Sequence, residues 1–316
     1  SSSAATDPAV PVTSTALAAG GAHTVILQSD GSLWVAGDNS VGQLGTGSST
    51  DVLTAIKLVD SGVAQVSAGF DFTAFVKTDG SVWVMGHNDR GQLGLGDTTD
   101  RNVPTQLLSG GASAVSAGNG HLLVLKTDGS VWGTGANTGE DAGALCQGDA
   151  DISDHSSLVQ VLDSGVAQVA AGRYFSLLRK TDGSVWACGR DDNGQFGIDT
   201  QGSVAASPVQ TVASGVSAVF AGSGLSWVIK SDGSLWSAGY NSWGAVGAGL
   251  TDANVVTYTS NTAVTIVTSN YGVMSPNLSG GSYLRLEGAA GGVRSITSVA
   301  SAERVLTLPA SSSAVA

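Results

Sequence analysis

An eight-residue segment that recurs five times constrains the fold of this chain more than any other feature. It begins with Asp-Gly-Ser-Leu-Trp at residue 30 and returns, with small changes, at residues 79, 128, 182 and 232. The intervals between successive copies are 49, 49, 54 and 50 residues. A regular period of this length is typical of repeat proteins, in which each copy is one supersecondary unit. The chain is therefore expected to consist of stacked units of about fifty residues.

Each copy has the pattern of antiparallel β-structure. The Asp-Gly pair lies between an alternating apolar stretch and the Ser-Leu/Val-Trp segment, which predicts a tight hairpin turn whose glycine supplies the positive φ. A strand of small residues ending in Ala-Gly precedes each hairpin. A polar loop follows it, which reads Gly42-Gln43-Leu44-Gly45 in the first copy. About four short strands in a unit of this length predict a propeller blade.

The composition is typical of an all-β chain. The 316 residues include 45 glycines and 6 prolines, and 42% of the residues are hydrophobic. This apolar fraction is enough to build a sizeable core, which excludes a disordered chain, and the glycines follow no three-residue period, which excludes collagen. Alanine, valine, serine and threonine dominate where a helical protein would carry leucine, glutamate and lysine. We therefore expect an all-β fold with many turns.

The motifs of the repeat identify a family. Ala-Gly-x-x-His, Asp-Gly-Ser-Leu/Val-Trp-x-x-Gly and Asn-x-x-Gly-Gln-Leu-Gly follow one another in the first copy. This combination resembles the repeat of the regulator of chromosome condensation family, here of the bacterial, exported type. The resemblance covers roughly residues 13–250, although the last motif drifts in the fifth copy and the third copy carries an insertion. Seven blades usually close a ring in that family, so the resemblance implies a β-propeller of six to seven blades.

The repeats divide the chain into four parts. Residues 1–12 form an N-terminal segment that could latch the last blade, and residues 13–250 hold five clear repeats. Residues 251–310 hold a degenerate sixth repeat and a partial seventh, which lacks the Asp-Gly-Ser-Trp strand, and residues 311–316 form a C-terminal tail. The closing blade is thus expected to lack one inner strand. An unpaired strand edge is a template for another chain.

The charge balance argues against nucleic acid as a partner. The chain carries 13 Lys+Arg against 25 Asp+Glu, a net charge of −12, with no basic run of the kind that binds phosphate backbones. No apolar stretch approaches the roughly 18 residues of a membrane span. The chain opens with a serine- and alanine-rich stretch and no initiator methionine, as a mature protein does after signal removal. We therefore expect an exported protein, extracellular or at the cell surface.

Equivalent positions within the five copies can be compared with one another. His23 and His121 occupy a position that holds Phe72, Phe175 and Leu225 in the other copies, so this position is expected to provide packing rather than a proton or a metal ligand. One tryptophan position is shared by all five copies and is expected to be structural: Trp34, Trp83, Trp132, Trp186 and Trp236.

Two tryptophans fall outside that shared position. Trp227 and Trp243, with Tyr240, are therefore the aromatic candidates for contact with a partner. Aromatic side chains dominate the binding energy of many interfaces, and these three would lie on or near the loops of the fifth copy.

The insertion in the third copy, residues 139–155, is the one place where polar chemistry breaks the repeat. Three of its carboxylates, Asp149, Asp151 and Asp154, could gather oxygens around a calcium ion, although the spacing is not that of an EF-hand loop. A solvated acidic loop and a partner-binding loop that uses Glu140 and Asp141 are the alternatives. No other cofactor is predicted.

Cys146 and Cys188 are the only cysteines of the chain. An even count of cysteines in an exported protein favours a disulfide bond. Neither a motif nor the spacing of the two residues decides the matter, so the sequence leaves a disulfide and two free thiols as alternatives.

The sequence favours a non-enzymatic function. A Gly-x-Ser-x-Gly elbow, a phosphate-binding glycine loop followed by a helix and a Cys/His cluster are all missing from it. The leading hypothesis is an exported structural or protein-interaction subunit that assembles head-to-tail through its terminal strands into a homo-oligomer, fibre or surface array. The alternative is a soluble, inhibitor- or lectin-like module that binds a protein or glycan through its loops. The resemblance also implies a third interpretation, nucleotide exchange on a small GTPase, together with chromatin binding that the acidic charge disfavours.

Overall fold

The computed structural model describes residues 14–149, 151–198 and 203–240, together with the backbone of three further strands at residues 256–259, 283–287 and 292–296. The predicted N-terminal segment, the C-terminal tail and most of the predicted sixth and seventh repeats lie outside the described residues.

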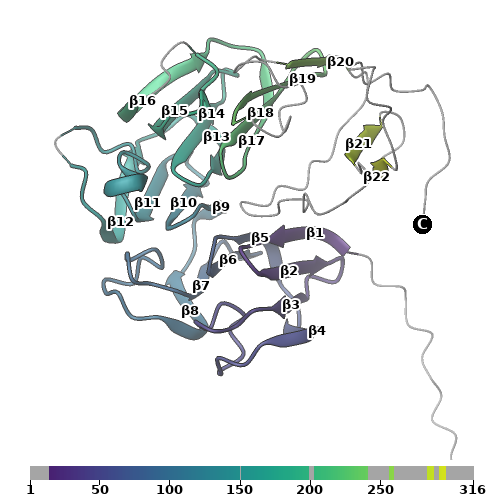
Figure 1. The fold of residues 1–316 in the computed structure, drawn as a ribbon. Helices are drawn as coiled ribbons and strands as arrows, with labels where there is room; N and C mark the ends of the chain where they lie inside the picture. Colours follow the sequence, from purple (N-terminus) through teal and green to yellow (C-terminus); the bar gives the residue numbers. More distant parts are fainter. Residues whose placement is uncertain are drawn as a thin grey trace, which may run out of the picture.

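Five four-stranded antiparallel sheets follow one another along the chain, each with its strands in sequence order (Figure 1). Blade 1 contains β1 (Ser14–Ala19), β2 (His23–Gln28), β3 (Leu33–Gly37) and β4 (Val52–Val59). Blade 2 contains β5 (Val63–Ala68), β6 (Phe72–Lys77), β7 (Val82–Gly86) and β8 (Arg101–Leu108). Blade 3 contains β9 (Ala112–Ala117), β10 (His121–Lys126), β11 (Val131–Gly135) and β12 (His155–Leu162). Blade 4 contains β13 (Val166–Ala171), β14 (Phe175–Lys180), β15 (Val185–Arg190) and β16 (Val204–Val212). Blade 5 contains β17 (Val216–Ala221), β18 (Leu225–Lys230), β19 (Ser234–Gly239) and β20 (Val256–Thr259).

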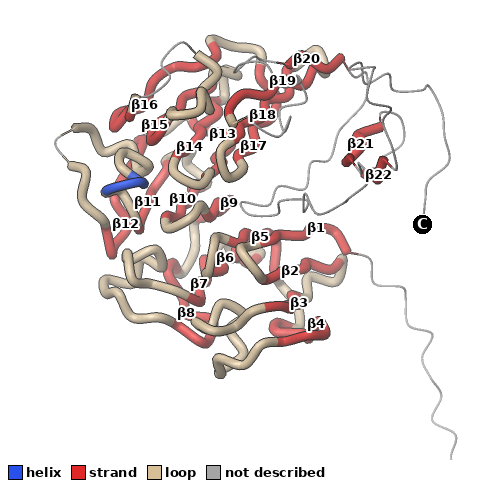
Figure 2. The backbone as a smooth tube through the Cα atoms, viewed as in Figure 1, coloured by secondary structure: helices blue, strands red, loops and turns tan. Residues whose placement is uncertain are grey.

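The predicted all-β propeller is thus confirmed, but the described residues form five blades where the resemblance implied six to seven. The last repeats have lost the Asp-Gly-Ser-Trp signature, and only one further hairpin is described, β21 (Tyr283–Glu287) with β22 (Gly292–Ile296). One short 3-10 helix, η1 (Gly139–Asp141), interrupts the strands and loops of the described residues (Figure 2).

The recurring octet forms a hairpin turn that satisfies its own polar groups. In blade 2, Asp79 Oδ1 accepts hydrogen bonds from the backbone N and the hydroxyl of Ser81, at 2.9 and 2.6 Å, and these bonds lower the pKa of the carboxyl. The Ser81 hydroxyl accepts a bond from Trp83 Nε1 at 3.0 Å, and Lys77 Nζ lies 4.5 Å from the Trp83 ring centroid. Gly80 has a φ of 78°, which explains why glycine recurs there. The shared tryptophan of each of the five blades donates in the same way to the serine two residues before it, so this position is structural.

The Asn-x-x-Gly-Gln-Leu-Gly motif forms the loop between the third and fourth strands. Asn39 is fully buried, and its Oδ1 accepts a hydrogen bond from Leu44 N at 3.0 Å. Its Nδ2 donates to Thr46 Oγ1 and to the carbonyls of Ser48 and Thr50, so that one amide organises the whole loop. Asn88 does the same in blade 2, where its Oδ1 accepts from Leu93 N at 2.9 Å.

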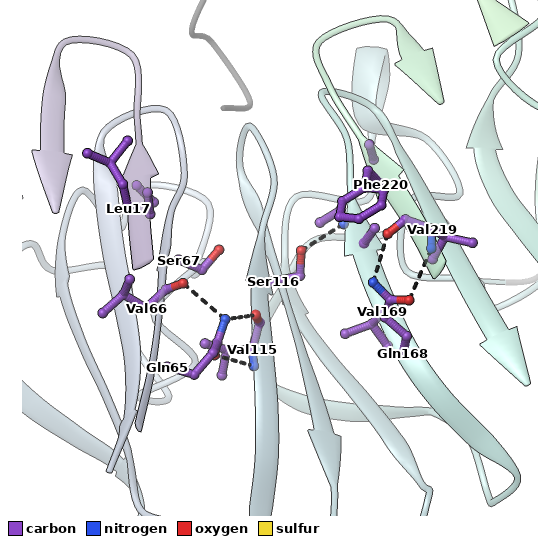
Figure 3. A pocket seen from close by; sticks show the side chains of 15 residues that line it. Leu17, Gln65, Val66, Ser67, Val115, Ser116, Gln168, Val169, Val219 and Phe220 are labelled. Atoms are coloured by element: carbon purple, nitrogen blue, oxygen red, sulfur yellow. Dashed lines mark hydrogen bonds between the residues drawn. The ribbon is translucent and has the colours of Figure 1, made fainter. Parts of the chain in front are cut away.

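The inner strands of neighbouring blades are joined by side chains (Figure 3). The Gln65 amide donates to Val115 O and accepts from Val115 N, both at 3.0 Å, so it pairs with the next inner strand as a peptide group would. Gln168 makes the same two bonds with Val219, at 2.8 and 3.0 Å. Ser67 in β5 and Ser116 in β9 each accept a hydrogen bond from the inner strand of the next blade. The inner strands line a cavity of about 180 Å³.

The two repeat histidines join blades farther from this cavity. His23 is buried and its Nε2 lies 2.9 Å from Thr73 Oγ1 in the next blade. The Thr73 hydroxyl donates in turn to Gln43 O at 2.8 Å, so His23 acts as the donor to Thr73. His121 lies in the same way 3.1 Å from Ser176 Oγ. Burial lowers the pKa of both histidines to about 4, so they are neutral packing residues near neutral pH, as expected.

Candidate partner-binding face

The two ends of the blades differ in what they carry. At one end, the entry turns between the first and second strands lie beside the long loops between the third and fourth, as the 2.9 Å bond from Asp38 N to Ala22 O shows. We call this end the loop face. At the other end, the Asp-Gly hairpin turns lie beside the connections between blades, as the 3.0 Å bond from Val63 N to Gly31 O shows. We call this end the hairpin face.

The loop face varies from blade to blade, whereas the hairpin face repeats the same residues. The two central residues of the entry turn differ in every blade, and in blade order they are Gly21-Ala22, Phe70-Asp71, Asn119-Gly120, Arg173-Tyr174 and Ser223-Gly224. Because the fold accepts all five pairs, it does not dictate the residue type at these positions. Variable loops on a rigid scaffold are where binding residues concentrate.

The predicted aromatic candidates separate in the structure. Tyr240 directly follows β19, lies beside the Gly224 entry turn and is 44% exposed on the loop face. Trp227 is half-buried within β18, where it pairs with Phe220 and Ser237 of the adjacent strands, so it does not lie in a loop. Trp243 lies outside the described residues. Phe70, which sequence reasoning missed, is 42% exposed in the entry turn of blade 2.

The insertion in blade 3 is smaller than the sequence suggested. Leu145 N donates to Asn137 Oδ1 at 2.9 Å, the same bond that Leu44 makes to Asn39 in blade 1. Residues 143–146 therefore take the place of the Gly-Gln-Leu-Gly motif, and the extra residues before them form η1. Of the two predicted partner-contact acids in η1, Glu140 is exposed and Asp141 is buried.

The three aspartates of the suggested calcium site make different contacts and do not converge on one point. Asp154 Oδ1 accepts a hydrogen bond from Asn137 N at 2.9 Å, as Asp51 and Asp100 do from the corresponding asparagines of blades 1 and 2. Asp151 instead binds Ser153 and His155, and Asp149 is exposed. Among the residues that the structure describes, no three acidic, histidine or cysteine side chains come close enough to hold a metal ion. The suggested calcium site is therefore not assembled. An Asp directly before the outer strands of blades 1, 2 and 3 is a signal that the sequence contained.

Arg90 of blade 2 fastens the loop of blade 3. Its guanidinium forms an ion pair with Asp154 and donates to Thr138 Oγ1 at 2.7 Å. Burial raises the pKa of Asp154, but hydrogen bonds from Arg90, Asn137 and Thr138 outweigh that effect and hold the pKa below its usual range. The ion pair and hydrogen bond of Arg90 thus hold the loop to the neighbouring blade.

Asp141 lies buried near Arg90 and Asp154. It is only 5% exposed, and no hydrogen bond reaches its buried Oδ1 within the described part of the chain. Burial raises the pKa of the carboxyl to about 7; the nearby Arg90 opposes this shift, whereas Asp154 and Glu140 add to it. The group is therefore protonated over much of the acidic range.

Tyr174 lies at the exposed side of the same cluster. Its hydroxyl donates to Glu140 Oε2, and this bond lowers the pKa of Glu140. Two guanidinium groups lie over its ring, Arg173 at 4.6 Å and Arg190 at 5.7 Å from the centroid. Arg173 is exposed and Tyr174 is partly exposed, so a tyrosine ring with two nearby guanidinium groups reaches the surface of the loop face.

A disulfide bond joins Cys146 and Cys188, with their Cα atoms 5.4 Å apart. Of the two alternatives that the sequence left open, the structure thus has the bonded one. Cys146 has a φ of 56° and occupies the position of the last glycine in Gly-Gln-Leu-Gly, where Gly197 has a φ of 69°. A Cβ added to Gly197 would lie 3.2 Å from Ala238 Cβ, the counterpart of Cys188 in blade 5. A side chain at this position of the repeat therefore points toward the next blade.

Sequence comparison decides which family these features represent. The family model of the RCC1-like domain matches residues 3–300. The chain belongs to the RCC1-like domain family. A search of curated proteins finds no match to it.

Solved structures of RCC1-like proteins share its fold. Human WBSCR16 has a TM-score of 0.68 and 22% sequence identity, over 82% of this chain and 70% of that chain. Prp20p from Saccharomyces cerevisiae, studied for its binding to Gsp1p and histones, has a TM-score of 0.54 and 19% identity, over 80% of this chain and 79% of that chain. Yeast RCC1 (Prp20) bound to Kap60 has a TM-score of 0.50 and 19% identity, over 75% and 72% of the two chains. In the described part of this RCC1-like chain, no helix is long and apolar enough to span a membrane.

Proposed function

We propose that this chain is a non-enzymatic RCC1-like propeller that recognises a protein partner through its loop face. The observation that carries the proposal is the contrast between the two faces. The hairpin face repeats a self-satisfied turn, whereas the loop face differs in every entry turn and presents Phe70, Tyr240 and the Arg173-Tyr174 pair. Tyrosine, phenylalanine and arginine are enriched at protein interfaces, and arginine and tyrosine are typical hot-spot residues.

The chemistry of the face favours protein over nucleic acid. The net charge of the chain is −12, and two of the loop-face arginines are paired with carboxylates, Arg90 with Asp154 and Arg190 with Asp192. The similar structures of Prp20p and yeast RCC1 concern binding to Gsp1p, histones and Kap60, all of which are proteins. These names support a protein partner of this chain without identifying it.

Site-specific photo-crosslinking tests this proposal. A photoreactive amino acid is placed at Phe70 or Tyr240 on the loop face and, as a matched control, at the exposed Thr181 in a hairpin turn. The protein is then irradiated in extract of its source cells. We expect the same crosslinked protein from the two loop-face positions and none from Thr181, and Arg173→Ala should weaken the product. Equal labelling from both faces, or glycan in place of protein in the product, would refute the proposal.

An extracellular or cell-surface location is part of the proposal. Its support is the disulfide between Cys146 and Cys188, because disulfides persist in oxidising compartments and are rare in the cytosol. Trapping thiols with an alkylating reagent at the moment of cell lysis measures the redox state directly. Two alkylated cysteines in the freshly trapped protein would contradict the location.

Two other functions, nucleotide exchange and head-to-tail assembly, can be tested separately. Nucleotide exchange on a small GTPase is suggested by the similarity to Prp20p, and loss of labelled nucleotide from candidate GTPases measures it. Head-to-tail assembly through the terminal strands involves residues outside those described, and electron microscopy of the purified protein distinguishes fibres from single particles.

A further inference from the structure

Arg173 differs from the other loop arginines because no described carboxylate forms an ion pair with it. It occupies the first central position of the entry turn of blade 4, and its side chain is exposed. The guanidinium groups of Arg90, Arg101 and Arg190 each form an ion pair with an aspartate. The Arg173 guanidinium instead lies over the ring of Tyr174, 4.6 Å from the centroid. Within the described part of the chain, its positive charge therefore has no direct counter-ion.

The entry turn that carries Arg173 is fixed by both neighbouring blades. Arg173 N donates to Gly222 O of blade 5 at 3.2 Å. On the other side, the Tyr174 hydroxyl donates to Glu140 Oε2 in η1 of blade 3. These contacts place the backbone of the turn and leave the arginine side chain exposed. Arg173 is thus an exposed charge on a rigid support.

Tyr174 provides a platform for the guanidinium. Its carbonyl accepts a hydrogen bond from Arg190 N at 2.9 Å and its hydroxyl is bound to Glu140, so the residue is held at both ends. A guanidinium over an aromatic ring keeps the N–H groups at its edge available as donors. A side chain that is already positioned also loses less conformational entropy when it binds. The platform therefore prepares Arg173 for an anionic ligand.

Arg90 shows which anionic group a loop arginine of this fold binds. Its Nε and Nη2 atoms donate to Oδ2 and Oδ1 of Asp154, so one guanidinium holds both oxygens of one carboxylate across a junction between blades. This two-point geometry is typical of arginine with carboxylate. Arg173 offers the same fork on the surface of the loop face.

The charge around Arg173 limits the size of the ligand. The hydrogen bond from Tyr174 and the charges of Arg190 and Arg173 lower the pKa of Glu140, so this neighbouring carboxyl is ionised near neutral pH. The chain as a whole has a net charge of −12. A phosphate group carries more negative charge than a carboxylate and would be repelled more strongly. The site therefore fits a short segment with few carboxylates better than a phosphorylated or highly acidic polymer.

We propose that Arg173 is the anchor for a short acidic segment of the protein partner. An aspartate or glutamate side chain of that segment accepts two hydrogen bonds from the Arg173 guanidinium, as Asp154 does from Arg90. Glu140 lies beside the site and opposes the segment by its charge. The inference rests on the proposed function in placing a protein on the loop face, and it adds the chemistry that blade 4 recognises.

Fluorescence anisotropy with labelled peptides tests the site on the purified protein. One peptide contains three consecutive glutamates between glycine and serine residues, and the other has glutamines in their place. At low ionic strength, where charge pairing is least screened, we expect only the glutamate peptide to bind. Arg173→Ala should weaken its binding about tenfold, the effect of losing a charge-assisted pair. Arg173→Lys keeps the charge without the fork and should weaken it less.

Two further variants separate local recognition from overall charge. Glu140→Gln should tighten binding of the glutamate peptide, because it removes the opposing charge and keeps an acceptor for the Tyr174 hydroxyl. The matched control is Arg101→Ala, which removes one positive charge from the loop of blade 2 and should leave the affinity unchanged. Because Arg173 is exposed, its replacement should also leave the circular dichroism spectrum unchanged.

Several results would overturn the assignment. These are equal binding of the glutamine peptide, failure of the glutamate peptide to bind the wild type, and an affinity that Arg173→Ala does not change. A phosphoserine peptide that binds where the glutamate peptide does not would assign the site to phosphate instead. The assay contains no cell extract, so its failure leaves photo-crosslinking from Phe70 or Tyr240 unaffected. Loss of those crosslinks would likewise leave the peptide result unaffected, and the two proposals therefore fail separately.

Discussion

Replacing Asp141 by asparagine should stabilise the protein at alkaline pH and leave it nearly unchanged in acid. Below its ordinary pKa of 3.8 the carboxyl is neutral in both the folded and the unfolded chain. Between 3.8 and about 7 it ionises in the unfolded chain while burial keeps it protonated in the folded protein, so each rise in pH favours unfolding. The stability that the neutral carboxyl provides is therefore lost as the pH rises through the folded pKa.

The size of the effect follows from the shift. A change of one pKa unit corresponds to about 1.4 kcal/mol, so the rise from 3.8 to about 7 sets an upper limit of roughly 4 kcal/mol above pH 7. Relaxation of the loop and water entry reduce this figure. The uncharged amide of the variant avoids the ionisation, so its advantage over the wild type should grow with pH and level off above pH 7.

Urea unfolding followed by tryptophan fluorescence, repeated from pH 4 to pH 9, measures the difference in unfolding free energy. Asp149→Asn is the matched control because Asp149 is exposed in the same loop, and its difference from the wild type should stay small at every pH. A difference for Asp141→Asn that is constant across the range would show that the carboxyl does not titrate as its burial requires. Destabilisation that grows with pH would refute the reasoning outright.

Three further predictions concern the junctions between blades. Replacing Cys146 and Cys188 by alanine should lower the unfolding free energy by about 4 kcal/mol, the chain-entropy value for residues 42 apart, and urea unfolding with and without reductant checks it. Gly197→Cys with Ala238→Cys should form a second inter-blade disulfide, since the added Cβ lies 3.2 Å from Ala238 Cβ, and thiol titration should find no free thiol. His23→Phe should lower the unfolding free energy by about 1 kcal/mol because the bond to Thr73 is lost. His23→Ala should lower it by about 3 kcal/mol because packing is lost as well, and equal losses in thermal unfolding would contradict this.

Much of the fold could be predicted because the repeat records it five times. The Asp-Gly turn, the shared tryptophan and the Asn-centred loop each have a local cause, and Asn39 with Leu44 shows that one buried amide explains a whole motif. The number of blades could not be predicted from the same pattern, because the last repeats no longer carry these local signals.

The candidate site was harder to predict than the fold. Asp154 looked like a metal ligand because it was considered within the insertion, although Asp51 and Asp100 precede the outer strands of blades 1 and 2 in the same way. Phe70 and the burial of Asp141 depend on how entry turns and loops pack in space, and no sequence period reports that.

The disulfide also makes the blades mechanically unequal. Blades 3 and 4 share a covalent bond, whereas blades 1 and 2 are joined within the described residues by noncovalent contacts such as the His23–Thr73 bond. A chain stretched between its two ends in an optical trap should therefore release its blades in several steps of unequal force. The chain between Cys146 and Cys188 should not extend until reductant is added. The extra extension that appears with reductant therefore identifies the unfolding step of blades 3 and 4 among the others.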